Sequence, residues 1–521
     1  MKVIRIGLLS LILISGPILW IYLLSLEMTM YVWYIAFTIP IWLLLLGLWY
    51  LCFGKSRFKT RLLRLGSGIG IAVLLGVLFG ALFEYEGSSS GSSYPTYRWR
   101  WSAADEGASV AELRTSESAF DFSESEIGES LDFLGPQRDG LWTNAKFETD
   151  WVKTPPVELW RRPVGKSWSS FAVVEGKAIT MEQAGDNERV TCLDALSGEE
   201  IWHYDEVGVR LMLEKEENAG IRMGGDGPRS TPVVHEGKVY SLGSTGFVTC
   251  IDLQSGSLVW KRNVIKEFEG EVQKWGSANS PLILAEEKTV VVPGTDLPGV
   301  NLVAFDLLSG ETVWTFEGSG ASYSSPRLVE IDGVPQILAI HQQEIAGHNP
   351  VTGQQLWAHE WRGPFPKSAQ PLLIGDSDIL ACASYGVGSL LVRVSRDGNS
   401  WSTEQLWKST RMKTKFSSPV VLGDFAYGLD EGRLACISLE SGDRIWKNEK
   451  FGFGQNLLFG EHLLVQTEKG DVVIGQVDAT GFNETGRVAA LSSMTWNAPT
   501  VAGRLLLARN DREAVAYLLG E

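Results

Sequence analysis

Two kinds of hydrophobic pattern divide this chain. Apolar residues run almost without interruption over residues 3–26, 31–53 and 65–83. After about residue 155, short apolar and alternating runs are separated instead by Gly, Pro, Asp and Ser. Continuous runs of about 20 apolar residues have the length of membrane-spanning helices, whereas short runs bounded by turn residues are typical of β-strands. The pattern predicts an anchor of three transmembrane helices in residues 1–83, followed by an all-β region.

A nine-residue motif, called the box here, recurs in the all-β region. It consists of a short acceptor residue, a Gly four positions later and a Trp four positions after that. The five copies are Asp194–Gly198–Trp202, Asp252–Gly256–Trp260, Asp306–Gly310–Trp314, Asn349–Gly353–Trp357 and Ser438–Gly442–Trp446. The acceptor binds backbone N–H groups of a tight turn, and Gly supplies the positive φ that the turn requires. The Trp on the next strand is a wedge suited to the gap between sheets.

A second motif, called the opener here, gives an independent count of the repeats. It is a pair of small or polar residues, usually followed by Pro, before a hydrophobic strand. The eight copies are Ser169–Ser170–Phe171, Ser230–Thr231–Pro232, Asn279–Ser280–Pro281, Ser324–Ser325–Pro326, Ala369–Gln370–Pro371, Ser417–Ser418–Pro419, Gln455–Asn456–Leu457 and Asn497–Ala498–Pro499. Boxes and openers together predict eight units of four strands, an eight-bladed β-propeller within a domain of residues 135–521.

The two ends of the repeat region are complementary. The last unit ends one strand short, while residues 157–160 form a Trp strand with no box before it. We therefore expect circular closure, with this N-terminal strand completing the C-terminal blade, because closure removes exposed sheet edges. The blades around Asp397–Gly398 and Asp478–Gly481 depart from the box spacing and should be the least regular.

Basic residues orient the predicted anchor. Lys2 and Arg5 flank the first run, and five further Lys and Arg residues lie between residues 55 and 64. The positive-inside rule places both groups in the cytoplasm. The propeller then lies on the extracytoplasmic side of a bacterial cytoplasmic (inner) membrane, in the periplasm where there are two membranes. A cleaved signal peptide is the alternative for the first run, but its length and the absence of a clear cleavage site favour an uncleaved helix.

Residues 84–134 have the composition of a flexible linker. Residues 87–93 are all Gly or Ser, and acidic residues greatly outnumber Arg114 between residues 105 and 132. Such a segment has few apolar side chains with which to form a core. We expect order to resume at the stretch Gly135–Trp142.

Charge and cysteine content exclude several functions. The formal net charge is −16, and because the first 83 residues are basic, the remainder is more acidic still. An acidic surface repels phosphate backbones and argues against nucleic acid as a partner. One Cys lies in a predicted membrane helix and the other four lie in separate blades without a CxxC pair, while the six His show no metal-ligand spacing. Neither a disulfide nor a metal site is predicted.

The boxes and openers resemble the pyrroloquinoline-quinone (PQQ) repeat family over about residues 155–521. Gly135–Gly140 also resembles the entry to the first blade in membrane-anchored bacterial members. The resemblance implies one of two functions. Quinoprotein alcohol dehydrogenases hold PQQ and a calcium ion over the central channel. Binding-only relatives, such as the lipoprotein of the outer-membrane assembly machinery, use the propeller as a docking platform.

The sequence favours the binding-only function. The dehydrogenases carry two adjacent cysteines beside the quinone and long insertions that supply calcium ligands and an Asp base. This chain has no Cys-Cys pair, and its longest spacing between successive box Trp residues, from Trp202 to Trp260, leaves little room for such insertions. We predict no catalytic residue, cofactor or metal, and a membrane-tethered propeller that docks a protein, peptide or glycan. A PQQ- and calcium-dependent oxidoreductase is the alternative.

Candidate binding residues immediately precede five of the openers. They are Trp168, Arg229, Tyr323, Phe416 and Trp496. Circular symmetry should bring these residues around one end of the channel, where aromatic and Arg side chains are the usual contacts for a peptide or ligand. Packing between blades, with no contact to a partner, is the alternative explanation for them.

Overall fold

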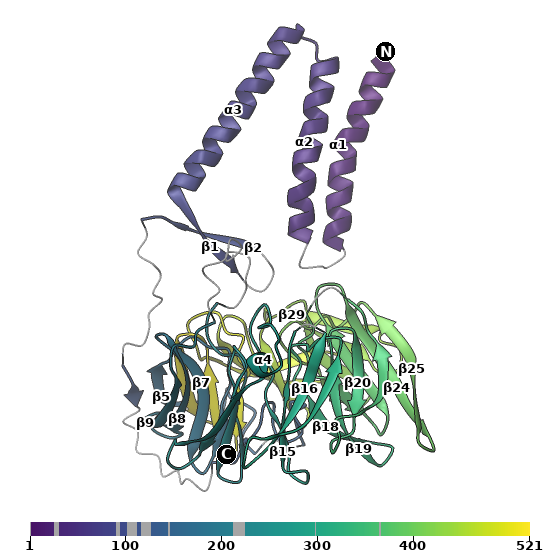
Figure 1. The fold of residues 1–521 in the computed structure, drawn as a ribbon. Coiled ribbons are helices and arrows are strands. Elements are labelled where there is room, and N and C mark those ends of the chain that lie inside the picture. Colours follow the sequence, from purple (N-terminus) through teal and green to yellow (C-terminus); the bar gives the residue numbers. More distant parts are fainter. Residues whose placement is uncertain are drawn as a thin grey trace. The chain divides into compact units, whose positions relative to one another are not determined.

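The computed structural model divides the chain into two compact units, described separately here. One comprises Met1–Glu106 with Glu217–Met223, and the other comprises Gly107–Glu216 with Gly224–Glu521 (Figure 1). The structure describes residues 2–25, 31–89, 94–101, 112–115, 127–143, 146–211, 225–296, 298–363 and 366–521.

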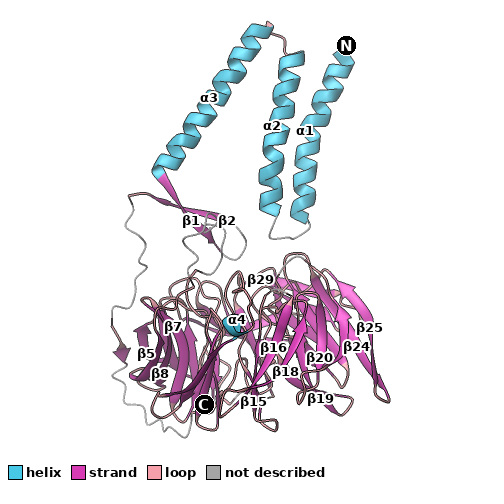
Figure 2. Cartoon of the chain, in the orientation of Figure 1, coloured by secondary structure: helices cyan, strands magenta, loops and turns pink. Residues whose placement is uncertain are grey.

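Helices make up most of the first unit (Figure 2). They are α1 (Lys2–Ser25), α2 (Tyr31–Phe53) and α3 (Phe58–Leu82). Residues Tyr34–Phe53 and Phe58–Leu82 are long and apolar enough to cross a membrane and are not buried, whereas the apolar stretch of α1, Ile6–Ile21, is shorter. The third helix begins at Phe58 rather than at residue 65, because the Lys and Arg residues expected in a loop are good helix formers.

A hairpin occupies part of the segment expected to be a flexible linker. Strand β1 (Phe83–Ser89) pairs antiparallel with β2 (Tyr94–Trp99). Phe83 lies opposite Trp99, with ring centroids 5.3 Å apart. Aromatic cross-strand pairs of this kind stabilise a hairpin, a local signal that composition alone conceals. Residues 102–111 and 116–126 of the expected linker lie outside the described residues.

The second unit is an eight-bladed β-propeller, as predicted. Seven blades have four consecutive strands paired antiparallel in chain order. Blade 1 holds β6 (Ala172–Val174), β7 (Lys177–Ala184), β8 (Asn187–Asp194) and β9 (Glu200–Glu206). Blade 2 holds β10 (Val233–His235), β11 (Lys238–Leu242), β12 (Phe247–Asp252) and β13 (Leu258–Asn263), followed by the short helix α4 (Val264–Glu267). Blade 3 holds β14 (Leu282–Leu284), β15 (Thr289–Pro293), β16 (Gly299–Asp306) and β17 (Thr312–Gly318). Blade 4 holds β18 (Arg327–Ile331), β19 (Val334–Ile340), β20 (Glu344–His348) and β21 (Gln355–Glu360); blade 5 holds β22 (Leu372–Ile374), β23 (Asp378–Ala383), β24 (Gly388–Asp397) and β25 (Ser400–Ser409).

The last three blades complete the ring. Blade 6 holds β26 (Val420–Leu422), β27 (Phe425–Asp430), β28 (Arg433–Ser438) and β29 (Arg444–Lys450). Blade 7 holds β30 (Gln455–Phe459), β31 (His462–Gln466), β32 (Asp471–Val477) and β33 (Phe482–Ala489), with β4 (Leu141–Trp142) added beside β30. Blade 8 holds β34 (Thr500–Ala502), β35 (Leu505–Arg509), β36 (Glu513–Leu518) and the N-terminal β5 (Val157–Pro163), with β3 (Arg114–Thr115) beside β5.

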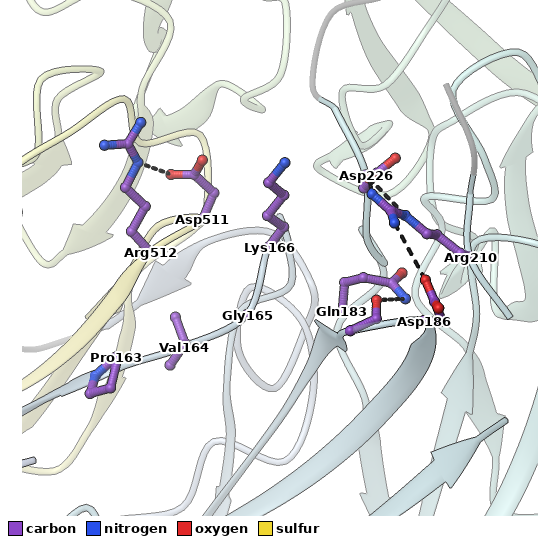
Figure 3. Close-up of a pocket in the computed structure, with 11 residues that line it drawn as sticks. Pro163, Val164, Gly165, Lys166, Gln183, Asp186, Arg210, Asp226, Asp511 and Arg512 are labelled. Carbon is purple, nitrogen blue, oxygen red and sulfur yellow. Dashed lines mark hydrogen bonds and ion pairs between the residues drawn. The ribbon is translucent and has the colours of Figure 1, made fainter. Parts of the chain in front are cut away.

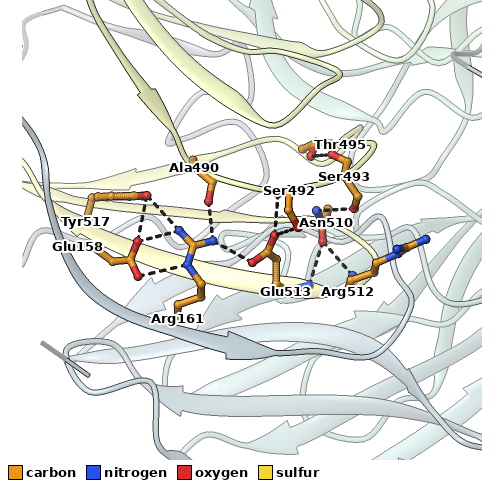
Figure 4. Close-up of polar contacts among 10 residues, drawn as sticks. All are labelled: Glu158, Arg161, Ala490, Ser492, Ser493, Thr495, Asn510, Arg512, Glu513 and Tyr517. Carbon is orange, nitrogen blue, oxygen red and sulfur yellow. Dashed lines mark hydrogen bonds and ion pairs between the residues drawn. The ribbon is translucent and has the colours of Figure 1, made fainter. Parts of the chain in front are cut away.

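Circular closure is therefore confirmed, and a polar cluster holds the closing strand (Figure 4). Arg161 on β5 donates from Nη1 to Glu513 Oε2 on β36 at 2.8 Å and from Nη2 to Glu158 Oε2 at 2.7 Å. Its Nη1 also donates to the carbonyl of Ala490 at 2.7 Å. Burial alone would raise the pKa of Glu513, but hydrogen bonds from Ser492 and Arg161 outweigh it and lower the pKa.

Each box joins its blade to the blade before it. Trp202 Nε1 donates to the carbonyl of Leu253 in the next box at 2.8 Å, and a Cβ placed on Gly256 would lie 2.8 Å from the Trp202 ring. Gly256 has φ +69°, so both the turn and the Trp of the preceding blade require glycine. The same Nε1-to-carbonyl bond joins Trp160 to Ala195, Trp260 to Leu307, Trp314 to Pro350, Trp407 to Leu439 and Trp446 to Asp478.

In the two irregular blades, 5 and 7, other contacts replace the missing contacts between a Trp and a box. Blade 5 has strands of ten residues that meet at Asp397 and Ser400, so Trp357 of blade 4 donates to Gln336 Oε1 in its own blade at 2.7 Å. Blade 7 has no Trp on β33. There Trp151, which is 3% exposed, packs against Gly486, where a Cβ would lie 2.2 Å from Trp151 Cβ.

The openers link neighbouring blades by hydrogen bonds around the ring. Ser170 N donates to Thr231 Oγ1 at 3.0 Å, Thr231 N to Ser280 Oγ at 3.0 Å, and Ser280 N to Ser325 Oγ at 2.9 Å. Gln370 N donates to Ser418 Oγ at 2.8 Å on the far side of the ring. A small hydroxyl at this position therefore satisfies a buried N–H of the blade before it, which explains why the openers carry Ser and Thr.

Residues 127–142, called the entry segment here, run along the first strands of most blades. Its backbone pairs with blade 1 at Val173, with blade 2 at Val234 and with blade 7 at Leu458. Residues 127–134, which the sequence analysis assigned to the linker, therefore contact the blades.

Two arginines fix the middle of the entry segment. Arg138, which is 3% exposed, donates to Asp132 Oδ1 at 2.7 Å and to the carbonyls of Pro281 and Ser280 in blade 3 at 2.6 and 2.9 Å. Arg327 of blade 4 donates to the carbonyl of Gln137 at 2.7 Å. Hydrogen bonds from arginine to backbone carbonyls thus hold a series of turns of the entry segment against the propeller.

Candidate functional site

The connections between strands emerge on two opposite faces of the propeller. Because the four strands of each blade run antiparallel, the segments before the openers and the turns between second and third strands emerge on one face, called the opener face. The box turns emerge on the other, called the box face. All five candidate binding residues precede openers, so they belong to the opener face.

Three of the five candidates form a continuous aromatic row. Trp496 of blade 8 lies between Trp168 of blade 1, with ring centroids 4.8 Å apart, and Phe416 of blade 6, 4.6 Å away. Phe453 of blade 7 extends the row at 6.3 Å from Phe416. Trp496 is 7% exposed, whereas Trp168 and Phe416 are half-buried and offer part of their rings to a partner.

The structure places the other two candidates apart from this row. Tyr323 contacts Trp275, with ring centroids 5.6 Å apart, and its hydroxyl accepts a hydrogen bond from the backbone N–H of Trp275 at 3.5 Å. Arg229 donates from Nη2 to the carbonyl of Gly225 at 2.6 Å. Burial lowers the pKa of Arg229 to about 10, although negative charge on Glu188 and Asp226 offsets part of that effect.

A buried lysine beside the aromatic row is not among the residues predicted from the sequence. Lys415, the residue before Phe416, is 3% exposed. Its ammonium lies 4.4 Å from the ring centroid of Tyr385 and 4.6 Å from that of Phe453. Burial lowers the pKa of Lys415 to about 8, against the opposing effects of Glu431 and Glu468. The only signal in the sequence is its place in the opener register, where Lys367 of blade 5 occupies the same position.

Two carboxylates face this lysine. Glu431 lies in the turn between β27 and β28, where its Oε1 accepts a hydrogen bond from Ser384 at 3.0 Å. Glu468, between β31 and β32, accepts from Trp496 Nε1 at 2.9 Å. Burial raises the pKa of both carboxyls, and the charge of Lys415 offsets part of the rise. The opener face therefore combines aromatic rings with poorly hydrated charges.

An open pocket of about 500 Å³ lies at the junction of blades 8 and 1 (Figure 3). Lys166 and the Arg512–Asp511 pair stand on one side of it, and Asp226, Arg210 and Asp186 stand on the other. Arg210 Nε donates to Asp226 Oδ2 at 3.0 Å. Three acids and three bases balance one another among the lining residues, so the pocket has no strong preference for a ligand of one charge.

The cysteines and acidic residues in the described part of the chain do not fit a quinone and calcium site. Cys192, Cys250, Cys382 and Cys436 are free, buried and in four different blades, so they form no adjacent pair. Burial raises the pKa of the Cys250 thiol to about 11. Within the described residues, no group of three or more His, Cys, Asp or Glu side chains could hold a metal ion.

Similarity to known proteins agrees with this architecture. Residues 158–448 match the family model described as outer membrane protein assembly factor BamB. BamB of Burkholderia pseudomallei is 23% identical over 60% of this chain and 86% of its own length. BamB of Yersinia pestis is 35% identical, but the match covers 22% of this chain and only a quarter of that protein.

Solved structures show the same fold at low identity. BamB from Moraxella catarrhalis has a TM-score of 0.50 and 15% identity, covering 70% of this chain and 100% of that one. A europium-containing methanol dehydrogenase has a TM-score of 0.52 and 11% identity, covering 75% and 90%. These structures share the propeller and do not decide between binding and catalysis. Because the family model matches more than half of the chain, the chain belongs to the PQQ-like repeat β-propeller family described as outer membrane protein assembly factor BamB.

Proposed function

We propose that this chain is a membrane-anchored, non-catalytic propeller that docks a protein or peptide partner on its opener face. The aromatic row of Trp168, Trp496, Phe416 and Phe453 is the observation that carries the proposal. Aromatic side chains are enriched among the residues that dominate binding energy at protein interfaces. Arg229 and Tyr323 extend the proposed surface to blades 2 and 4.

Two further observations support the proposal. The matching family is named for the assembly of outer membrane proteins, and the described residues contain neither an adjacent pair of cysteines nor a cluster of metal ligands. The apolar helices α2 and α3 supply the anchor, with α1 as a third proposed span. The basic residues before and within α3 favour a cytoplasmic position for this end of the anchor, which supports a propeller on the extracytoplasmic side of the inner membrane.

Site-specific crosslinking in cells tests the docking surface. The photoreactive amino acid p-benzoylphenylalanine at Phe416 should give discrete protein adducts after illumination. The matched control carries it at Leu308, an apolar residue that is 75% exposed in a box turn of blade 3. Adducts at Phe416 but not at Leu308 are expected. Equal adducts at both positions, or none at Phe416, would contradict docking on the opener face.

Reconstitution tests the alternative chemistry. The full chain, purified in detergent, is mixed with PQQ and calcium and passed over a sizing column. We expect no quinone absorbance in the protein peak and no dye reduction with alcohols. A stoichiometric quinone band with dye-linked alcohol oxidation would overturn the non-catalytic proposal.

A further inference from the structure

Lys415 is a buried cation whose ammonium has no hydrogen-bond partner. Among the described residues no donor–acceptor contact satisfies its Nζ, which is itself shielded from solvent. Lys413, two residues earlier and equally buried, shows the usual arrangement, with its Nζ 3.2 Å from Asp430 Oδ1. An unpaired buried charge is costly, so this chain pairs one buried lysine and leaves the next one unsatisfied.

An unsatisfied acceptor accompanies this unsatisfied donor. Glu431 Oε2 is buried and also lacks a hydrogen-bond partner within the described part of the chain. Its charge and that of Lys415 influence each other, yet no hydrogen bond joins them. A donor and an acceptor thus both lack a hydrogen-bond partner here, Lys415 beside the rings of Tyr385, Phe416 and Phe453 and Glu431 beside Ser384.

The hydrogen-bonding properties of Lys415 and Glu431 indicate which chemical group can bind to both. A group that satisfies both atoms must accept a hydrogen bond from an ammonium and donate one to a carboxylate, and a peptide backbone does both with its C=O and N–H. The entry segment shows that this propeller already binds a part of its own backbone through hydrogen bonds to carbonyl groups. Arg327 donates to the carbonyl of Gln137, and Val234 N donates to the carbonyl of Leu131. These contacts favour a polypeptide over a glycan.

We infer that Lys415 and Glu431 form a docking site for an extended peptide segment of the partner. Lys415 donates to a backbone carbonyl of that segment and Glu431 Oε2 accepts a backbone N–H, while the aromatic row contacts the side chains. The inference rests on the proposed function and names the chemistry of its partner. It explains why the face keeps a charge that lowers the stability of the free protein.

Peptide display on the full chain tests the inference. A library of random seven-residue peptides, flanked by glycine linkers, is selected on the wild-type protein in detergent at pH 7. Peptides enriched on the wild type should bind Lys415→Met at least about tenfold more weakly, since a hydrogen bond to a charged group is lost. Glu431→Gln, which keeps the size of the side chain, should weaken the same peptides.

The melting temperature of the variants separates binding from structure. Methionine removes the unsatisfied charge and keeps the length of the side chain, so Lys415→Met should melt about 2 °C higher than the wild type. The control Lys413→Met breaks a buried pair and should melt lower. A lower melting temperature for Lys415→Met would show that Lys415 is structural and would overturn the inference.

The binding outcomes distinguish this inference from the proposed function. Peptides that bind Lys415→Met as tightly as the wild type would overturn the role of Lys415 while leaving docking on the aromatic row intact. Failure to enrich any peptide on the wild type would overturn the peptide chemistry and indicate that water alone satisfies the two groups. Crosslinking at Phe416 tests the docking face independently of both results.

Discussion

Arg161 and Lys415 are two shielded cations in regions with different tasks. Arg161, at the closure of blade 8, has a side chain that is 15% exposed and binds Glu158, Glu513 and the carbonyl of Ala490. Lys415, on the opener face, is more deeply buried and is surrounded by aromatic rings without a hydrogen bond to its ammonium. The first charge is part of the structure that closes the ring, and the second has no hydrogen-bond partner among the described residues.

The two regions differ in whether their buried polar groups have hydrogen-bond partners. Repeated contacts on the box face and at the closure satisfy their polar groups, as expected for parts that only hold blades together. On the opener face, by contrast, Lys415 Nζ and Glu431 Oε2 are buried without a hydrogen-bond partner among the described residues. Local violations of the packing rules are expected at functional sites, because binding requires groups that the free protein leaves unsatisfied.

Removing the closing arginine should have the largest effect. Arg161→Met leaves the carboxylate of Glu513, whose side chain is 3% exposed, without its cation. We expect a loss of about 3 kcal/mol in the free energy of unfolding, as for a broken buried ion pair. Thermal unfolding of the full chain in detergent, followed by near-ultraviolet circular dichroism, measures it. A loss below about 1 kcal/mol would show that strand pairing alone closes the ring.

A box glycine should be nearly as sensitive. Gly256→Ala places a methyl group against the Trp202 ring at a φ of +69° and should cost about 2–3 kcal/mol. Gly237→Ala is the matched control, because Gly237 has φ +70° but no atom lies within 4 Å of the place where its Cβ would stand. It should cost about 1 kcal/mol, from backbone strain alone. Equal costs would mean that the Trp does not require glycine.

Acid should destabilise blade 4 through a buried histidine pair. His341 Nε2 and His348 Nε2 lie 3.0 Å apart, and burial lowers the pKa of His348 to about 4. Below the unfolded value of about 6.5 the unfolded chain binds a proton that the folded chain does not, so stability falls as pH falls from 6.5 towards 4. At pH 5 the loss due to His348 alone should be about 2 kcal/mol relative to pH 7.5, and His341, whose pKa is also lowered by burial, adds to this loss.

A double variant isolates the contribution of these histidines. His341→Gln combined with His348→Gln removes both titrating groups, so its stability should change less than that of the wild type between pH 7.5 and pH 5. Melting curves at both pH values provide the comparison. The same acid-induced loss in both proteins would assign the effect to carboxyl groups such as Glu513, whose pKa is lowered in the folded state.

The regular part of the molecule could be predicted from sequence because it repeats. The spacing of Gly256 and Trp260 recurs in other blades, and the openers such as Ser230–Thr231 gave the number of blades. Both motifs use local turn and packing chemistry that is visible in a short window. The three apolar helices followed from uninterrupted hydrophobicity, although the start of α3 at Phe58 did not.

The candidate site could be predicted only in part, because its contacts join residues that are distant in sequence. The opener register located Trp168, Phe416 and Trp496 but gave no indication that they stack. The ammonium of Lys415 lies over the ring of Tyr385 and interacts electrostatically with Glu431. Both of these residues lie in turns, of two different blades, that carry no motif. The contacts of the entry segment with the blades were missed for the same reason.

The signs of two melting shifts test the central claim most directly. Arg161→Met and Lys415→Met each replace one shielded cation by the same apolar side chain in the full-length protein. A lower melting temperature for Arg161→Met and a higher one for Lys415→Met are expected, because only the first cation has hydrogen-bonded partners that its removal leaves unpaired. A lower melting temperature for both variants would contradict the distinction between a structural charge and one kept for binding.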